Sequence, residues 1–296
     1  MVEQINRYEL RNRYVFKGKL VMQTAFHIGG GKATLSHSDS PVVLTPTEEP
    51  FIPGSSFKGA LRSTVEKLVP ALPAKKELFS CGLIELSDEA LEIEEAQAKQ
   101  NKRVVCSTIR QREIALERRE HSERAEQINA QALKDLCNTC QLFGSPFAAS
   151  RISINDLYVS KKEWSGIVEV RDGVAIDRDS ERARDRLKYD YEVVPASAVF
   201  DLEITLENAT DQDLQLICVG LSEFVHGFGT IGGKRSRGLG VCLLNDLKVS
   251  ALELVGREVS EKERDTRLRN YLLRRVFSSE STGEEFLNKH ISAIFE

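Results

Sequence analysis

The sequence predicts an α+β fold whose core follows the order β-α-β-β-α-β. Three observations support this prediction. Apolar and polar residues alternate in four separate stretches, as they do along half-buried strands. Two other stretches place apolar residues three or four positions apart, as on one face of a helix. Two highly charged segments interrupt this order, and we interpret them as insertions into a single domain of 296 residues.

The composition is that of a globular chain, because 41% of the residues are hydrophobic and 29% are charged. No stretch reaches the roughly 18 apolar residues of a membrane helix, and residues 1–14 lack the apolar run of a secretory signal. We therefore expect a cytoplasmic protein without a membrane partner. The net charge of −4 argues weakly against nucleic acid, so any such ligand must be recognised through local charge.

The first half of the core contains a strand, a long loop and a helix. The strand is predicted at 14–22, where YVFKGKLVM alternates. The loop at 26–54 is long enough to suggest a functional role. The helix that follows is predicted to be capped by Ser55 or Ser56 and to end before Pro70.

The second half returns to alternating patterns. Strands are predicted at 151–159, 198–208 and 241–252, with a helix at 213–228 between the last two. Without the insertions, the order of elements is that of the ferredoxin-like motif. The charged stretch at 171–191 contains an Asp-Gly turn signal and predicts a protruding hairpin.

The remaining segments attach to this core within one domain, 1–296. Strong helix formers and mixed charges predict a helical insertion, and solvation of an outer face is the plain explanation of its charges. The C-terminal residues are predicted to form a helix packed against the core. The boundaries are 14–70, 150–160 and 192–250 for the core, 74–141 for the insertion, 161–191 for the hairpin and 256–296 for the helical tail.

The segment HGFGTIGGKRSRGLG, at 226–240, is the densest motif. It contains Gly-x-Gly-x-x-Gly, but it follows a helix and opens a strand, the reverse of a dinucleotide-binding loop. Arg235 after Lys234 also excludes a P-loop. A flexible backbone with three cations can approach a phosphate chain, and the alternative is a turn with solvated charges. The candidate anion-binding residues are Gly232, Gly233, Lys234, Arg235 and Arg237.

The turn before the first helix, PFIPGSSFKGALRS at 50–63, is a second candidate. Free amides at a helix N-terminus bind phosphate, and two cations in the first turns of the helix add positive charge. Simple N-capping is the alternative and holds in either case. The candidate residues are Gly54, Ser55, Ser56, Lys58 and Arg62.

Four motifs follow one another along the chain: IGGGKATLSHSDSPVV, PFIPGSSFKGALRS, CQLFGS and GTIGGKRSRGLG. Together they resemble the RAMP superfamily, in particular the backbone subunits of type III CRISPR effector complexes, over 14–250. The resemblance implies an RNA-recognition-motif-like core. It also implies CRISPR RNA, complementary target RNA and the other subunits of the complex as partners. The hairpin at 161–191 would be the thumb, which displaces one nucleotide at regular intervals.

The resemblance further implies a metal-dependent endoribonuclease in which Asp39 cuts the paired target RNA. The chemistry agrees, because RNA supplies its own 2′-hydroxyl nucleophile. A carboxylate can bind hydrated Mg²⁺ or Mn²⁺ beside the phosphate, or accept the hydroxyl proton. An Asx-type turn before Ser40 is the alternative reading of Asp39. His37 would share a face with Asp39 in an extended segment and can assist it.

Two alternative functions also involve RNA binding. One is a structural scaffold that does not cleave. The other is an endoribonuclease that processes the precursor CRISPR RNA, and such enzymes in this superfamily commonly use a histidine near the first helix. His27 and His37 precede that helix and none lies within it, which disfavours processing.

Four cysteines lie in the insertion: one near its start, one in its middle and a C-x-x-C pair at its end. Four thiolates can bind one tetrahedral Zn²⁺, although one C-x-x-C with two single cysteines is a weaker signal than two paired motifs. His121 can replace one ligand. A redox C-x-x-C is disfavoured because no thioredoxin-like context surrounds it. A structural zinc is therefore predicted, and its ligands are Cys81, Cys106, Cys137 and Cys140.

Overall fold

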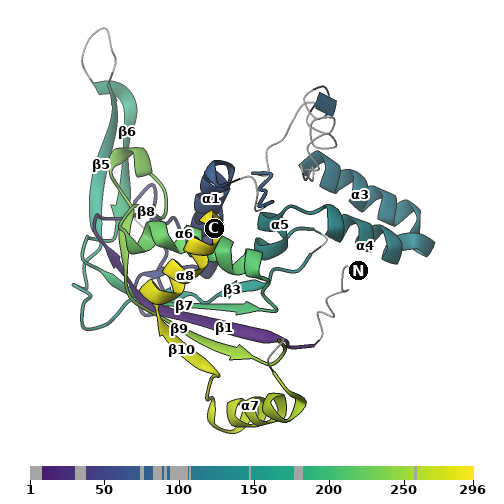
Figure 1. Cartoon of the computed structure of the whole chain (residues 1–296). Coiled ribbons are helices and arrows are strands. Elements are labelled where there is room, and N and C mark those ends of the chain that lie inside the picture. Colours follow the sequence, from purple (N-terminus) through teal and green to yellow (C-terminus); the bar gives the residue numbers. More distant parts are fainter. Residues whose placement is uncertain are drawn as a thin grey trace.

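An antiparallel sheet with the order β10-β9-β1-β7-β3 forms the centre of the protein, with β8 paired to β9 (Figure 1). The computed structural model describes residues 9–30, 38–73, 77–82, 89, 92–93, 106, 108–146, 148–176, 183–256 and 259–296. The sheet strands are β1 (Asn12–Met22), β3 (Ile152–Ile154), β7 (Val199–Glu207), β8 (Gly229–Thr230), β9 (Val241–Glu253) and β10 (Ser279–Thr282).

The order of the elements confirms the predicted fold. Helix α1 (Gly54–Leu68) connects β1 to β3, and α6 (Asp211–Val225) connects β7 to β9. The chain order is therefore β1-α1-β3-β7-α6-β9, the predicted β-α-β-β-α-β. These four strands lie side by side as β9-β1-β7-β3, the arrangement of a ferredoxin-like sheet.

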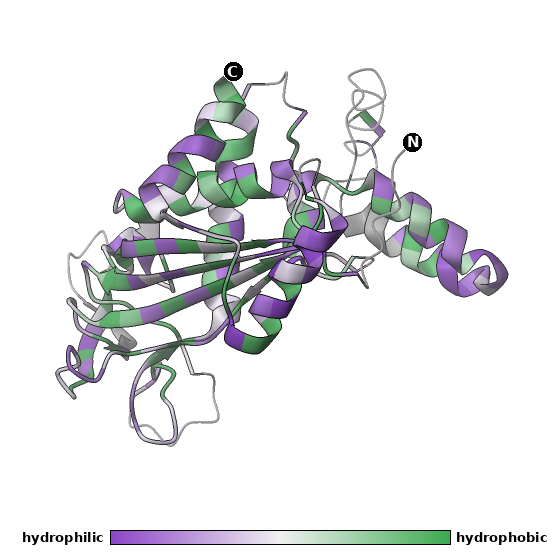
Figure 2. Ribbon diagram, turned by 60° about the horizontal axis from the view of Figure 1, so that its bottom comes forward, coloured by the Kyte–Doolittle hydropathy of each residue, from purple (hydrophilic) through white to green (hydrophobic). Residues whose placement is uncertain are grey.

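The two faces of the sheet differ in chemistry. Helices α1, α6 and α8 (Gly283–Phe295) cover one face (Figure 1), where Phe16 and Leu20 of β1 are fully buried. Successive strand residues point to opposite sides of the sheet, and the residues that alternate with the buried apolar ones are mostly polar. The other face is therefore polar, and Figure 2 shows this alternation of hydropathy along the strands. On this face Lys17 pairs with Glu203 at 2.9 Å.

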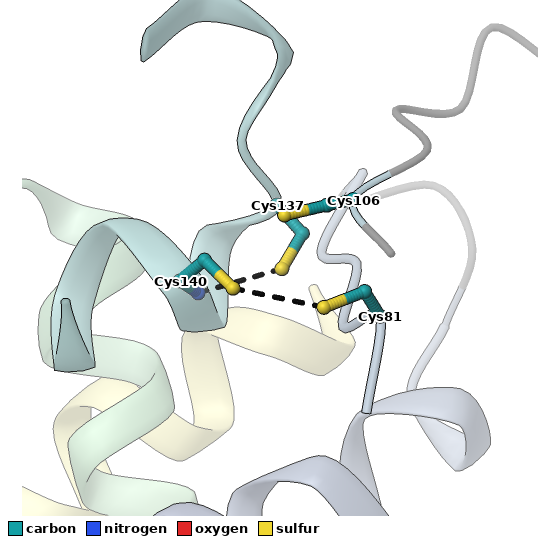
Figure 3. A group of neighbouring side chains, drawn as sticks. All are labelled: Cys81, Cys106, Cys137 and Cys140. Carbon is teal, nitrogen blue, oxygen red and sulfur yellow. Dashed lines mark hydrogen bonds between the residues drawn. The ribbon is translucent and has the colours of Figure 1, made fainter. Parts of the chain in front are cut away.

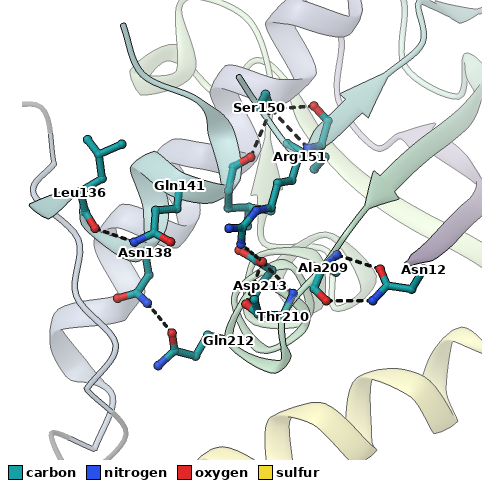
Figure 4. A network of polar contacts seen from close by, with 12 residues as sticks. Asn12, Leu136, Asn138, Gln141, Ser150, Arg151, Ala209, Thr210, Gln212 and Asp213 are labelled. Atoms are coloured by element: carbon teal, nitrogen blue, oxygen red, sulfur yellow. Dashed lines mark hydrogen bonds and ion pairs between the residues drawn. The ribbon is translucent and has the colours of Figure 1, made fainter. Parts of the chain in front are cut away.

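Helix α6 is anchored to the residue just before β3 by a buried ion pair (Figure 4). Arg151 binds Asp213, whose side chain is 3% exposed. Asp213 also forms a capping box with Thr210 at the start of α6, so one carboxylate closes a helix end and joins it to the sheet. Asn138 Nδ2 donates to Gln212 Oε1 at 2.8 Å and ties the insertion to the same end of α6.

The helical insertion projects from the side of the core (Figure 1). Beyond α1 the chain makes a short 3₁₀ turn at Val69–Ala71, and the described helices of the insertion follow. A small hydrophobic cluster of Cys106, Leu136, Cys137, Cys140 and Ala148 lies at the base of these helices. The helices are α3 (Thr108–Glu120), α4 (Ala125–Asp135) and α5 (Asn138–Phe143), with a 3₁₀ turn at Ser122–Arg124.

Strands β5 (Glu169–Ile176) and β6 (Ala183–Val193) form an antiparallel hairpin that extends away from the core (Figure 1). The hairpin was predicted, but the turn expected at its Asp-Gly pair was wrong, because Gly173 lies within β5 opposite Tyr189. A Cβ atom at Gly173 would lie 2.4 Å from the Tyr189 ring, so glycine makes room for that ring. A short pair of strands, β2 (Phe51–Ile52) and β4 (Leu157–Tyr158), lies beside the main sheet.

The C-terminal region contains more than the predicted helix. Helix α7 (Glu261–Arg274) is followed by β10 and then by α8. Strand β10 pairs with β9, and α8 packs Phe286 edge-on against Phe16 at 5.5 Å between ring centroids. The sequence analysis missed β10 because its residues, Ser-Glu-Ser-Thr, show no apolar alternation.

Within the described part of the chain, none of the helices combines the length and the hydropathy required for a membrane span.

Candidate functional site

Strand β6 holds the loop at 38–42, which contains Asp39 and is called here the Asp39 loop. The Asp190 carboxylate accepts hydrogen bonds from Ser38 Oγ at 3.0 Å and from the Asp39 amide at 2.6 Å. In return, Asp39 Oδ2 accepts from the Asp190 amide at 3.1 Å. This reciprocal pair fixes the exposed Asp39 against the base of the hairpin.

Two further groups hold the same loop. The Glu192 amide donates to Ser40 O at 3.0 Å, and Glu192 Oε2 accepts from the Val42 amide at 2.9 Å. His27, which is 7% exposed, places Nδ1 2.7 Å from Glu192 O and Nε2 3.2 Å from Ser40 Oγ. Because a carbonyl can only accept, Nδ1 carries a proton and donates it to Glu192 O. His27 is thus a buried brace of the loop.

The opposite side of β6 faces the glycine-rich loop at 226–240. Tyr189 and Tyr191 alternate with the two acidic residues along the strand and stack at 6.1 Å between ring centroids. Lys234 Nζ lies 4.5 Å from the Tyr191 centroid, and the Arg237 guanidinium lies 5.6 Å from that of Tyr189. Arg237 also donates to the Tyr189 hydroxyl, which raises the pKa of Arg237 above its ordinary value. Cation–π attraction therefore positions both cations.

The glycine-rich loop also approaches the buried histidine through its backbone. The Gly233 amide donates to His27 O at 2.8 Å. Gly232 has a φ of +82°, and a Cβ atom there would lie 2.4 Å from the same oxygen. Glycine is therefore required at this close approach. Gly232, Gly233, Lys234, Arg235 and Arg237 thus lie in one loop beside β6, with Arg235 and Arg237 exposed.

The N-terminus of α1 is arranged differently from the sequence prediction. Its N-cap is Pro53, without a side-chain cap, so the proposal that Ser55 or Ser56 caps the helix was wrong. The Gly54 amide instead donates to Asp156 Oδ1 at 2.8 Å, because a carboxylate is stabilised at a helix N-terminus. The sequence analysis missed Asp156, since 102 residues separate it from its partner.

The two cations of α1 point toward the insertion and β3. Lys58 Nζ donates to Ser150 Oγ at 2.8 Å, and burial lowers the pKa of Lys58. Arg62 donates to Glu66, to Gly144 O and to the sulfur of Cys140. Within the described residues, no hydrogen bond or ion pair links either cation to the Asp39 loop or the glycine-rich loop. RNA contact by Gly54, Ser55, Ser56, Lys58 and Arg62 stays a prediction.

The structure brings together all four predicted zinc ligands (Figure 3). The sulfur atoms of Cys81, Cys106, Cys137 and Cys140 lie within 4.8 Å of one another, and Cys81 Sγ lies 3.6 Å from Cys140 Sγ. A tetrahedral zinc with Zn–S bonds of about 2.3 Å requires sulfur spacings of about 3.8 Å, so the arrangement fits the ion. His121 is not in this group and lies beside Glu123 instead, while His37 lies outside the described residues.

The chain, with its Asp39 loop and its glycine-rich loop, belongs to a known class of protein. The chain is a member of the RAMP superfamily, whose family model matches residues 19–242. That span includes the Asp39 loop, the β5–β6 hairpin, the cysteine cluster and the whole glycine-rich loop.

Short segments of the chain are also similar to curated proteins called CRISPR system Cms endoribonuclease Csm3. The identity is 45% over 62 residues for that of Enterococcus italicus, 39% over 59 residues for that of Methanothermobacter thermautotrophicus, and 37% over 60 residues for that of Methanocaldococcus jannaschii. These segments cover 20%, 19% and 20% of this chain and 29%, 24% and 24% of the relatives. The matches therefore span less than a third of each relative.

Proposed function

We propose that this chain is an RNA-binding backbone subunit of a type III CRISPR effector complex and that Asp39 cleaves target RNA paired with the guide. Membership of the RAMP superfamily and similarity to proteins named as endoribonucleases support this proposal. One structural observation carries it: β6 binds the Asp39 loop with one side and the cationic glycine-rich loop with the other. A carboxylate and a group of cations that can bind phosphate thereby lie beside the same strand, and we propose that they form one site.

Each part of this site has a chemical role. Lys234, Arg235 and Arg237 would bind the sugar–phosphate backbone, which positions RNA without reading its sequence. Pairing with the guide would supply specificity, as in other RNA-guided systems. One oxygen of Asp39 is held by Asp190, and no described residue donates to the other, which can accept the 2′-hydroxyl proton.

The oxygen donors beside β6 suit a hard divalent cation. When bound, hydrated Mg²⁺ or Mn²⁺ would stabilise negative charge on the reacting phosphate. Asp39 would hold such an ion, while Asp190 keeps the loop in place through its bonds to Ser38 and the Asp39 amide.

The test uses the complex reconstituted with wild-type chain, Asp39→Asn, or the control Asp201→Asn. Asp201 is an exposed carboxylate on the polar face of the sheet, paired with Lys19. We expect Asp39→Asn to bind guide RNA but to lose cleavage of guide-paired target, while the control cleaves normally. Equal cleavage by all three would refute catalysis by Asp39, and no cleavage by any of them would favour the non-cleaving scaffold. Specific cuts by the isolated chain inside precursor repeat RNA would favour the processing enzyme.

We also propose that the four cysteines bind one structural Zn²⁺. Besides the sulfur spacing, the buried hydroxyl oxygens of Ser80 and Thr139 have no partner among the described residues. Each adjoins a cysteine in sequence, and thiolate ligands offer acceptors that such hydroxyls need. Metal analysis of the purified chain should find about one zinc per chain. Absence of zinc, with four freely titrating thiols, would contradict this proposal.

A further inference from the structure

Arg62 lies at the junction between α1 and the cysteine cluster. Its Nη2 donates to Cys140 Sγ at 3.3 Å, and its Nη1 donates to Gly144 O at 3.2 Å. Its Nε donates to Glu66 Oε1 at 2.8 Å, and the side chains of both residues are only 16% exposed. The guanidinium is thus held by Glu66 of its own helix while it contacts the Cys140 sulfur of α5.

A zinc ion with four thiolates carries a net charge of −2. Burial of such a charge is unfavourable unless cations or hydrogen-bond donors compensate it. Arg62 supplies a permanent positive charge and a planar set of N–H donors, while the Cys140 amide donates to Cys137 Sγ at 3.4 Å. Neutral thiols are poor acceptors, so this set of donors matches thiolates better than thiols.

We propose that Arg62 is a positioning residue for the zinc centre: it orients and partly neutralises the Cys140 thiolate and so joins the insertion to α1. This inference rests on the proposed zinc site. It gives Arg62 a role different from the RNA contact that its charge suggested. Its loss should leave the four ligands in place but weaken their hold on the metal, because hydrogen bonds to ligand atoms tune metal affinity.

The experiment compares the full chain with Arg62→Gln, Arg62→Lys and the control Lys58→Gln. Lys58 lies one turn earlier on α1 and contacts Ser150 and Ile152 instead of sulfur. Each protein is loaded with zinc, and the release of zinc to excess chelator is followed together with the reaction of its thiols. Unfolding midpoints of the metal-free proteins report any general loss of packing.

We expect Arg62→Gln to release zinc at least about tenfold faster than wild type, which is the usual size of an effect beyond the ligand shell. Arg62→Lys should lie between the two, because it keeps the charge but loses the planar donors. The control should release zinc at the wild-type rate. Equal release by wild type and Arg62→Gln, or equal acceleration by the control, would overturn the role of Arg62. A wild-type chain without zinc would overturn the metal site itself.

Discussion

The cations of the glycine-rich loop give the most quantitative test of RNA binding. Lys234, Arg235 and Arg237 lie on one loop, and replacing all three by glutamine removes three candidate phosphate contacts. For single strands, the slope of log affinity against log salt changes by about 0.7 per phosphate contact. The triple variant should therefore have a slope about 2 units shallower. Between about 50 and 200 mM salt, wild type should lose about 18-fold more affinity than the variant.

The stacked tyrosines should act on the same binding without changing that slope. Tyr189→Leu removes the ring against which Arg237 rests and the hydroxyl that it binds. The cations remain, so the number of neutralised phosphates stays the same. Arg237, however, loses the contact that holds its side chain in one position. An exposed cation–π contact contributes about 0.5–1 kcal/mol, so affinity should fall about two- to fivefold at every salt concentration.

The assay is fluorescence anisotropy of the full chain with a labelled single-stranded RNA at several salt concentrations. Lys17→Gln on the polar face of the sheet is the control, because its partner Glu203 already pairs with it. A triple variant with the wild-type slope would refute the placement of RNA along the glycine-rich loop. A Tyr189→Leu slope as shallow as that of the triple variant would refute the positioning role of the tyrosine.

Three other predictions follow from the contacts around the core. Asp190→Ala removes the acceptor for Ser38 and the Asp39 amide, so cleavage by the reconstituted complex should fall about 10- to 100-fold while guide binding persists; unchanged cleavage would exclude this support. Asp213→Ala leaves Arg151 buried without its partner, so the free energy of unfolding in urea should fall by about 3–5 kcal/mol; a loss below about 1 kcal/mol would show that solvent replaces the carboxylate. Removal of metal by a chelator should make 108–143 sensitive to limited proteolysis while the sheet stays protected, and an unchanged pattern would argue against a stapling zinc.

Local patterns were enough to predict the core elements. Apolar alternation located β1, β7 and β9, and helical spacing located α1 and α6, because those periods reflect which side of each element is buried. The chain order of these elements then implied the ferredoxin-like sheet. The four cysteines were also found from spacing, although only the folded chain shows their sulfur atoms within 4.8 Å of one another.

The parts that sequence reasoning missed depend on contacts between distant segments. Asp190 meets Asp39 across 151 residues, and Tyr189 meets Arg237 only because β6 passes beside the glycine-rich loop. The spacing of apolar residues within one segment does not encode contacts between segments so far apart in the sequence. The side chains of Lys58 and Arg62 lie toward Ser150 and α5, a placement that their spacing on the helix does not encode, and their contact with RNA stays a prediction.

Crosslinking tests most directly whether the two loops beside β6 form one RNA site. Guide RNA carrying photoreactive uridines would be bound to the full chain, and the crosslinked peptides would be identified by mass spectrometry. The expected peptides contain 38–42, 189–192 and 232–237, joined to the same few nucleotides. Crosslinks confined to the polar face of the sheet, at Lys17, Lys19 and Lys248, would contradict the proposed site.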